Sequence, residues 1–123
     1  MMLVSYSTMD WSVDRGSESP LHEQLAAAVR RSLQEGHLVA GEKLPPASEL
    51  AAVLDINANT VLHAYRGLRA EGVLEFRRGR GVRVSPGAPA RSVVVDAARH
   101  LLAVGRAFGY SPAALASLIE DLS

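Results

Sequence analysis

The stretch NANTVLHAYRGLRAEGVLEFRRGRG, which runs from Asn57 to Gly81, decides the fold. Asn57 is a favourable N-cap, because its side-chain oxygen can accept hydrogen bonds from the free amides of a first helical turn. Apolar residues then recur at three- and four-residue spacing, as on one face of an amphipathic helix: Val61, Ala64, Tyr65 and Leu68. Gly72 suits the left-handed position just past a helix end. The pattern therefore predicts a helix that reaches about Glu71.

The second half of the stretch predicts a β-hairpin with a basic tip. The β-prone segments VLEF (73–76) and VRVS (82–85) flank the pentapeptide RRGRG (77–81). Gly79 and Gly81 can adopt the positive φ that a tight reversal needs. A solvated charged loop remains the alternative interpretation of the arginines.

The residues before Asn57 predict two more helices. Pro20 opens a helical pattern that runs from Leu21 to Leu33, and Gly36 ends it. The segment GEKLPP (41–46) reads as a turn or short strand, and ASELAAVL (47–54) as a short helix. The order helix, short helix, tight turn, longer helix and hairpin is that of a winged helix-turn-helix. We therefore expect a mainly α fold with a small β wing (α+β), with this domain and an N-terminal extension over residues 1–85.

The distribution of charge matters more than its total. The 123-residue chain has a formal net charge of zero, but residues 56–86 hold six Arg against two Glu, a local charge of +4. A local basic patch is what phosphate contact requires, because solvated charges are screened beyond about 8 Å at physiological salt. The hydrophobic content of 48% predicts a folded protein.

Other function classes find little support in the sequence. The chain lacks Cys, and its four His residues show no metal-binding spacing. No catalytic or nucleotide-binding motif is present, so we expect neither an enzyme nor a cofactor nor a metal site. The N-terminus is a poor signal peptide, and no run approaches the ~18 apolar residues of a membrane span. We therefore expect a cytoplasmic protein without membrane contact, associated with the nucleoid when it binds DNA.

The segment from SPLHEQL to GVRV, about residues 18–85, resembles the DNA-binding domain of the GntR family of bacterial transcription regulators. That family typically reads P-L-Y-x-Q-I, then G-x-L-x-P-G-x-x-L-P-S-x-R-x-L-A, N-x-N-T-V-x-x-A-Y-x-x-L-x-x-E-G and R-x-G-x-G. The chain departs from this pattern at Pro46 and Ser48, which replace the family's Ser and DNA-contacting Arg. Ala58 stands where relatives have Arg or Pro, and Val82 and Arg83 replace a common Thr-Phe.

These observations together define a candidate DNA interface. Asn59 and Thr60 are placed to read a base edge or hold a phosphate, whereas capping alone would also explain Asn57. His63 is placed to contact phosphate or stands inert on a solvated face, and Arg66 suits the DNA backbone. We expect the wing glycines to let the hairpin approach DNA closely, and Trp11 to fill the core. The full candidate set is Ser48, Asn57, Asn59, Thr60, His63, Arg66, Arg77, Arg78, Gly79, Arg80 and Gly81.

The residues after the hairpin predict a linker over 86–90 and a two-helix tail over 91–123. Ser111 is an N-cap candidate, with Pro112 at the first helical position. Two such helices are too small to enclose a core, so they fold back on the same monomer or pair with a second chain. We favour a homodimer on a palindromic DNA operator, with half-sites about 34–36 Å apart. The residues expected at the dimer interface are Val94, Ala98, Leu101, Gly105, Phe108, Leu115, Leu118, Ile119 and Leu122.

The short tail is similar to that of the YtrA subfamily within the GntR family. That resemblance implies a repressor, typically of an adjacent transporter operon. A small-molecule effector would find room only at the subunit interface, since drug-sized ligands need about 300 Å³ or more. The alternative function is a protein-interaction adaptor that keeps the winged helix as a scaffold, and Ser48 and Ala58 favour that alternative.

Overall fold

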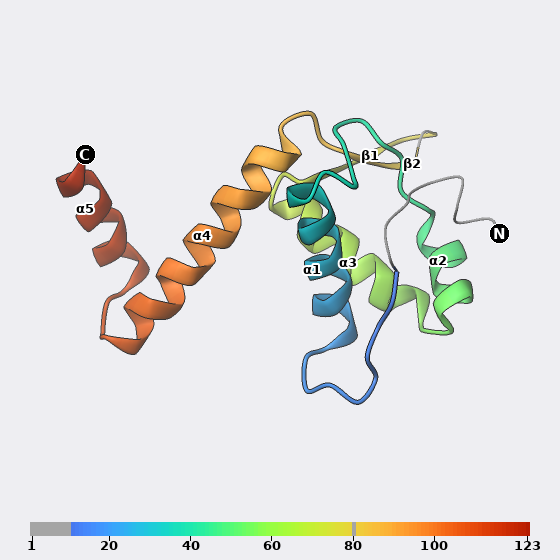
Figure 1. Cartoon of the computed structure of the whole chain (residues 1–123), viewed down its shortest axis with the longest axis horizontal. Coiled ribbons are helices and arrows are strands. Elements are labelled where there is room, and N and C mark those ends of the chain that lie inside the picture. Colours follow the sequence, from blue (N-terminus) through green and yellow to red (C-terminus); the bar gives the residue numbers. More distant parts are fainter. Residues whose placement is uncertain (1–10, 80) are drawn as a thin grey trace. The chain divides into compact units, whose positions relative to one another are not determined.

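The computed structural model describes residues 11–79 and 81–123 and is mainly helical with one small sheet (Figure 1). Its elements are α1 (Leu21–Gln34), α2 (Ala47–Leu54), α3 (Ala58–Ala70), β1 (Leu74–Arg77), β2 (Gly81–Val84), α4 (Ala88–Ala107) and α5 (Pro112–Leu122). The chain divides into two compact units, one reaching Ser92 and the other running from Val93 to Ser123. This architecture confirms the expected fold class.

The tight turn between α2 and α3 is fixed at both of its ends. Asp55 closes α2 in the left-handed conformation, with φ of 56°. The side chain of Asn57 accepts a 2.8 Å hydrogen bond from the amide of Asn59, which confirms the predicted cap of α3. Arg15 holds the turn from outside, because its Nη2 donates to the carbonyls of Leu54 at 2.9 Å and Asp55 at 2.5 Å. The turn thus sets α2 and α3 as a helix-turn-helix.

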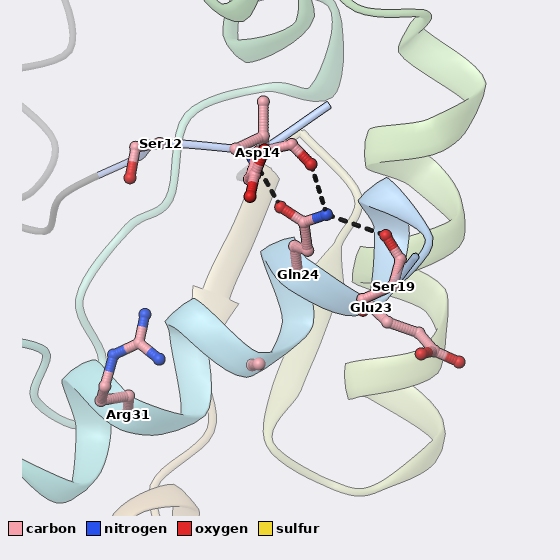
Figure 2. A pocket seen from close by; sticks show the side chains of 8 residues that line it. Ser12, Asp14, Ser19, Glu23, Gln24 and Arg31 are labelled. Carbon is pink, nitrogen blue, oxygen red and sulfur yellow. Dashed lines mark hydrogen bonds between the residues drawn. The ribbon is translucent and has the colours of Figure 1, made fainter. Parts of the chain in front are cut away.

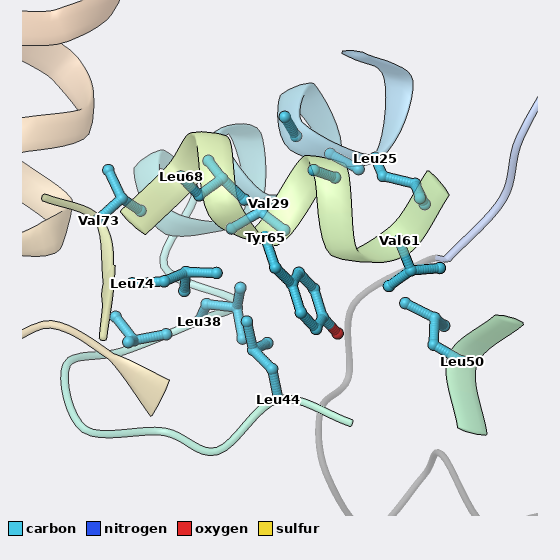
Figure 3. Packing of buried hydrophobic residues seen from close by; sticks show 14 of the residues in the cluster. Leu25, Val29, Leu38, Leu44, Leu50, Val61, Tyr65, Leu68, Val73 and Leu74 are labelled. Carbon is cyan, nitrogen blue, oxygen red and sulfur yellow. The ribbon is translucent and has the colours of Figure 1, made fainter. Parts of the chain in front are cut away.

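The core of the first unit lies where α1, α2 and α3 pack together with the segment before α2. Figure 3 shows the apolar side chains gathered there, among them Leu25, Val29, Leu44, Leu50, Val61, Tyr65 and Leu68. Tyr65 is 1% exposed, and its hydroxyl donates a 2.7 Å hydrogen bond to the carbonyl of Pro45. Burial raises the pKa of Tyr65. Trp11 also joins this core, as predicted.

The hairpin pairs β1 with β2 in antiparallel register, Leu74 opposite Val84 and Arg77 opposite Gly81. The strands are displaced by one residue from those expected. Gly79 and Gly81 have φ of 73° and 75°, as the predicted reversal requires. The segment before α2 borders β2 on its other side, because the amide of Leu44 donates to the carbonyl of Val82 at 2.9 Å. The segment before α2 therefore holds the outer edge of β2.

The linker is shorter than the expected 86–90, because α4 begins at Ala88. Pro89 falls in its first turn, where a missing amide proton breaks no helical hydrogen bond. Ala88 and Ser92 are fully buried, and Gln34 Nε2 of α1 donates to Ser92 Oγ at 3.3 Å. The first turn and a half of α4 therefore belongs to the first unit.

Within the described residues, no single helix is long and apolar enough to cross a membrane. α4 and α5 meet that length and composition test only when taken as a pair, and the chain bends by 114° between them.

Candidate nucleic-acid interface

The two faces of α3 differ sharply in burial. Val61, Ala64, Tyr65 and Leu68 are buried against α1 and α2. On the opposite side Asn59, His63 and Arg66 are exposed, and their spacing of four and three residues aligns them in one polar stripe. The first turn of α3 places Asn59 at the start of this stripe. Three of the sequence-predicted residues of α3 therefore form one polar face.

Three further candidate residues have limited polar groups to offer a ligand. The side-chain oxygen of Asn57 is engaged in the helix cap, which leaves its amide nitrogen to donate to another group. Thr60 is half-buried rather than fully exposed. Ser48 is exposed in the first turn of α2, where Pro46 provides no side-chain cap. Each of these side chains offers at most one polar group to a ligand.

The wing presents Arg77 and Arg78 to solvent next to Gly79. Arg77 Nε donates to Glu75 Oε1 at 3.0 Å, and the Arg77 side chain remains 53% exposed. An exposed ion pair of this kind contributes little to stability, so Arg77 can exchange Glu75 for a phosphate oxygen. The predicted Arg80 lies outside the described residues.

Two arginines that contribute to the local charge serve the fold itself. The guanidinium carbon of Arg69 lies 4.5 Å from the ring centroid of Phe76, a cation–π contact between α3 and β1. Arg83 Nη1 donates to the carbonyl of Gly41 at 3.2 Å. Arg66, Arg77 and Arg78 are therefore the described arginines of this region that remain as candidates for a ligand.

The structure adds one residue that sequence reasoning missed. His22, the second residue of α1, stacks on His63 with 3.8 Å between ring centroids and 16° between ring planes. His22 follows Leu21 where the GntR pattern has an aromatic Tyr. An imidazole thus replaces a phenol ring at His22, and this retained planar shape is the signal that could have identified the position from the sequence.

A polar hollow of about 350 Å³ lies beside α1, between that helix and the segment before it (Figure 2). Gln24 binds the two together. Its Nε2 donates to the carbonyls of Asp14 at 2.9 Å and Ser19 at 2.8 Å, and its Oε1 accepts from the amide of Asp14 at 2.7 Å. The polar groups of Gln24 are thus used to hold the chain on α1. In the described ranges no cluster of three or more His, Asp or Glu is placed to hold a metal ion.

The second unit presents an apolar surface. Ser111 Oγ accepts from the amide of Ala114 at 3.1 Å and Pro112 begins α5, both as predicted. Gly105 faces Leu115, and a Cβ at Gly105 would lie 2.7 Å from Leu115 Cδ1. An apolar hollow of about 240 Å³ opens beside this contact. Of the expected interface residues Leu115 and Gly105 are buried, Leu101 is half-buried, and six are exposed: Val94, Ala98, Phe108, Leu118, Ile119 and Leu122.

The helix-turn-helix, its polar helix face and the basic hairpin define a winged-helix protein of the DNA-binding class. The model of the bacterial regulatory proteins of the gntR family matches residues 21–84. The chain therefore belongs to the gntR family, as its motifs predict.

Individual relatives agree with this placement. The chain is 38% identical to the HTH-type transcriptional repressor YtrA of Bacillus subtilis over 62% of its own length and 58% of that protein. It is 36% identical to the HTH-type transcriptional regulator Rv1152 of Mycobacterium tuberculosis, over 81% of this chain and 84% of the relative. The solved structure of YtrA from Sulfolobus acidocaldarius, a GntR-family transcription factor, matches with a TM-score of 0.59 and 31% identity, over 73% of this chain and 95% of that one.

Less than two thirds of the Bacillus protein is thus covered by this chain. Both named relatives are transcription regulators.

Proposed function

We propose that this chain is a homodimeric transcriptional repressor that binds a palindromic DNA operator. The observation that carries the proposal is the polar stripe of α3, which lies on the side opposite the core. We assign Asn59 to base reading, because an Asn side chain matches the paired donor and acceptor of adenine. Arg66 and the arginines of the wing bind phosphates, since guanidinium groups pair with phosphate oxygens.

The exposed apolar residues of the second unit support the homodimer. Phe108 and Leu122 are each 78% exposed, and Val94 is 65% exposed. Large apolar residues exposed in this way favour a protein partner. A second copy of the same helices offers a matching surface, and a two-fold dimer presents two reading heads to two half-sites.

Repression is proposed from a relative, and the regulated genes are proposed from the resemblance to the YtrA subfamily. The name of Bacillus YtrA states that it is a repressor. We extend that role to this chain and propose control of a transporter operon beside its own gene, exerted in the cytoplasm at the nucleoid. The apolar hollow beside Gly105 is, at about 240 Å³, smaller than most drug-sized sites. A small-molecule effector would therefore need the second subunit to complete its site.

A salt-titrated binding assay on the DNA upstream of the chain's own gene tests DNA binding. A repressor prefers one sequence, and the logarithm of its affinity falls by about 0.9 per neutralised phosphate for each tenfold rise in salt. Replacing both Arg77 and Arg78 with Ala weakens binding to all sequences alike. It also reduces the slope of log affinity against log salt by the contribution of about two phosphates. Arg106→Ala, which removes an exposed arginine from α4, is the matched control.

Sequence preference has its own test in the same assay. Asn59→Ala changes the ranking of operator variants rather than lowering every affinity equally. A protein-interaction adaptor would show neither a preferred sequence nor a steep salt slope, and that result would overturn the proposal.

A further inference from the structure

The stack of His22 on His63 joins the first turn of α1 to the polar stripe of α3. The ring planes are nearly parallel, at 16°, and the centroids lie 3.8 Å apart. Across the described ranges neither imidazole forms a hydrogen bond, so the face-to-face contact is the specific interaction that each ring makes. His63 is exposed and His22 is half-buried. The more sheltered ring therefore serves as the platform for the more exposed one.

The position of His63 gives this platform a function. Asn59 precedes it by four residues and Arg66 follows it by three, so all three side chains project from one face of α3. An exposed side chain that must be ordered when a ligand binds lowers the affinity by about twofold to tenfold through its lost rotamer entropy. A ring already held in a stack avoids most of that loss.

We infer that His22 is a positioning residue of the DNA interface, which holds the imidazole of His63 in the orientation that donates a hydrogen bond to a DNA phosphate. Every protonation state of an imidazole carries at least one N–H donor, so the contact needs no particular charge. This inference rests on the proposed DNA binding and adds to it a residue of α1, a helix that contributes none of the candidate contacts. His22 acts through His63 and does not itself touch the DNA.

A double-mutant cycle on the full-length chain measures the coupling. We expect His63→Ala to weaken operator binding by about twofold to tenfold, and His22→Ala to weaken it by a similar factor. In the double variant the second substitution adds little, because the first has already removed the contact. His37→Ala is the matched control, since this imidazole is exposed in the first unit, with its Nδ1 3.7 Å from Glu35 Oε1. We expect that variant to bind as the wild type does.

A phosphate scan separates positioning from a merely structural role. Each backbone phosphate of the operator is replaced in turn by a neutral methylphosphonate. The wild-type protein loses affinity at the phosphate that His63 contacts, whereas His63→Ala and His22→Ala are both insensitive at that same position. His22→Tyr keeps an aromatic platform and restores both the affinity and the sensitivity. Thermal unfolding of each variant identifies any loss that comes from the fold.

Two results would overturn the inference. One is a His22→Ala variant that binds the operator as tightly as the wild type. The other is a His22→Ala variant that stays folded, binds more weakly and yet retains the sensitivity of the wild type at every phosphate. In both cases the wild-type protein still prefers its operator, so the proposed function stands. Failure of the proposed function is a different result, in which the wild type shows no preferred sequence.

Discussion

The two units of this chain bury their apolar residues to very different extents. In the first, three helices and the segment before α2 enclose a core in which Leu50, Val61 and Leu68 have no exposed surface. In the second, Val93–Ser123, Leu115 is the one buried large apolar side chain, whereas Phe108 and Leu122 are each 78% exposed. Both units contain amphipathic helices. Periodicity thus shows which face of a helix is apolar, and the number of packing elements decides whether the same chain can bury it.

The largest contrast should appear when the same substitution is made in each unit. Leu68→Ala removes a fully buried side chain and should lower the free energy of unfolding by about 2–5 kcal/mol. Leu122→Ala removes a side chain that is mostly in water and should change the monomer's stability by no more than about 0.5 kcal/mol. Urea unfolding at low protein concentration measures both. Equal losses would show that the second unit is packed as tightly as the first.

A charge on the exposed apolar surface should separate the proposed subunits. Phe108→Asp introduces a carboxylate that would be desolvated in a dimer, so we expect the dimer dissociation constant to rise by about a hundredfold or more. The monomer should keep its helix content, because this side chain is 78% exposed. Sedimentation velocity and circular dichroism provide the two measurements. A wild-type chain that is monomeric at micromolar concentration would remove the proposed interface.

The contact between α4 and α5 should tolerate little added volume. A methyl group at Gly105 would lie 2.7 Å from Leu115 Cδ1, so Gly105→Ala should destabilise the second unit by about 1–3 kcal/mol. Gly67→Ala is the control, because a Cβ there meets no atom within 4 Å among the described residues. Hydrogen exchange of the amides in α5 reports the effect locally. Equal protection in the two variants would show that Leu115 moves aside without loss.

A smaller difference should separate the two described tyrosines. Tyr65→Phe loses a buried hydrogen bond and should cost about 1 kcal/mol, whereas Tyr110→Phe, at a side chain 48% exposed, should be nearly neutral. Because burial raises the pKa of Tyr65, the unfolded chain releases this proton first, from its ordinary value of about 10. The contribution of Tyr65 to stability is therefore complete below about pH 10 and is lost as the pH rises above it.

Measuring the free energy of unfolding as a function of pH tests whether stability falls as the pH rises. The wild type should lose stability above pH 10 more steeply than Tyr65→Phe does. Parallel pH profiles for the two proteins would contradict the assignment.

Local sequence signals were sufficient for the helices and the wing. The Asn57 cap, the positive φ of Gly79 and Gly81 and the Ser111 cap all depend on residues within a few positions of one another. The extent of the linker was predicted less well, because the start of α4 depends on burial of Ala88 and Ser92 against the first unit. A Pro- and Gly-containing segment carries no local sign of such packing.

The roles of surface side chains were the hardest to predict. Arg69 and Arg83 were counted with the DNA-facing charge, yet one lies on the ring of Phe76 and the other donates to Gly41, 42 residues away in sequence. The platform provided by His22 likewise depends on a residue of a different helix. Sequence spacing gives the face from which a side chain projects, and only the fold gives its neighbour.

The hydrogen bonds of Arg15 to the carbonyls of Leu54 and Asp55 tie a residue that precedes α1 to the helix-turn-helix. The segment that the family shares, 21–84, begins six residues after this guanidinium and ends before the buried Ser92. The first compact unit therefore extends beyond the family segment at both ends. Proteolytic cleavage between Arg15 and Gly16 would leave the family segment intact while releasing the hydrogen bonds that hold the turn between α2 and α3.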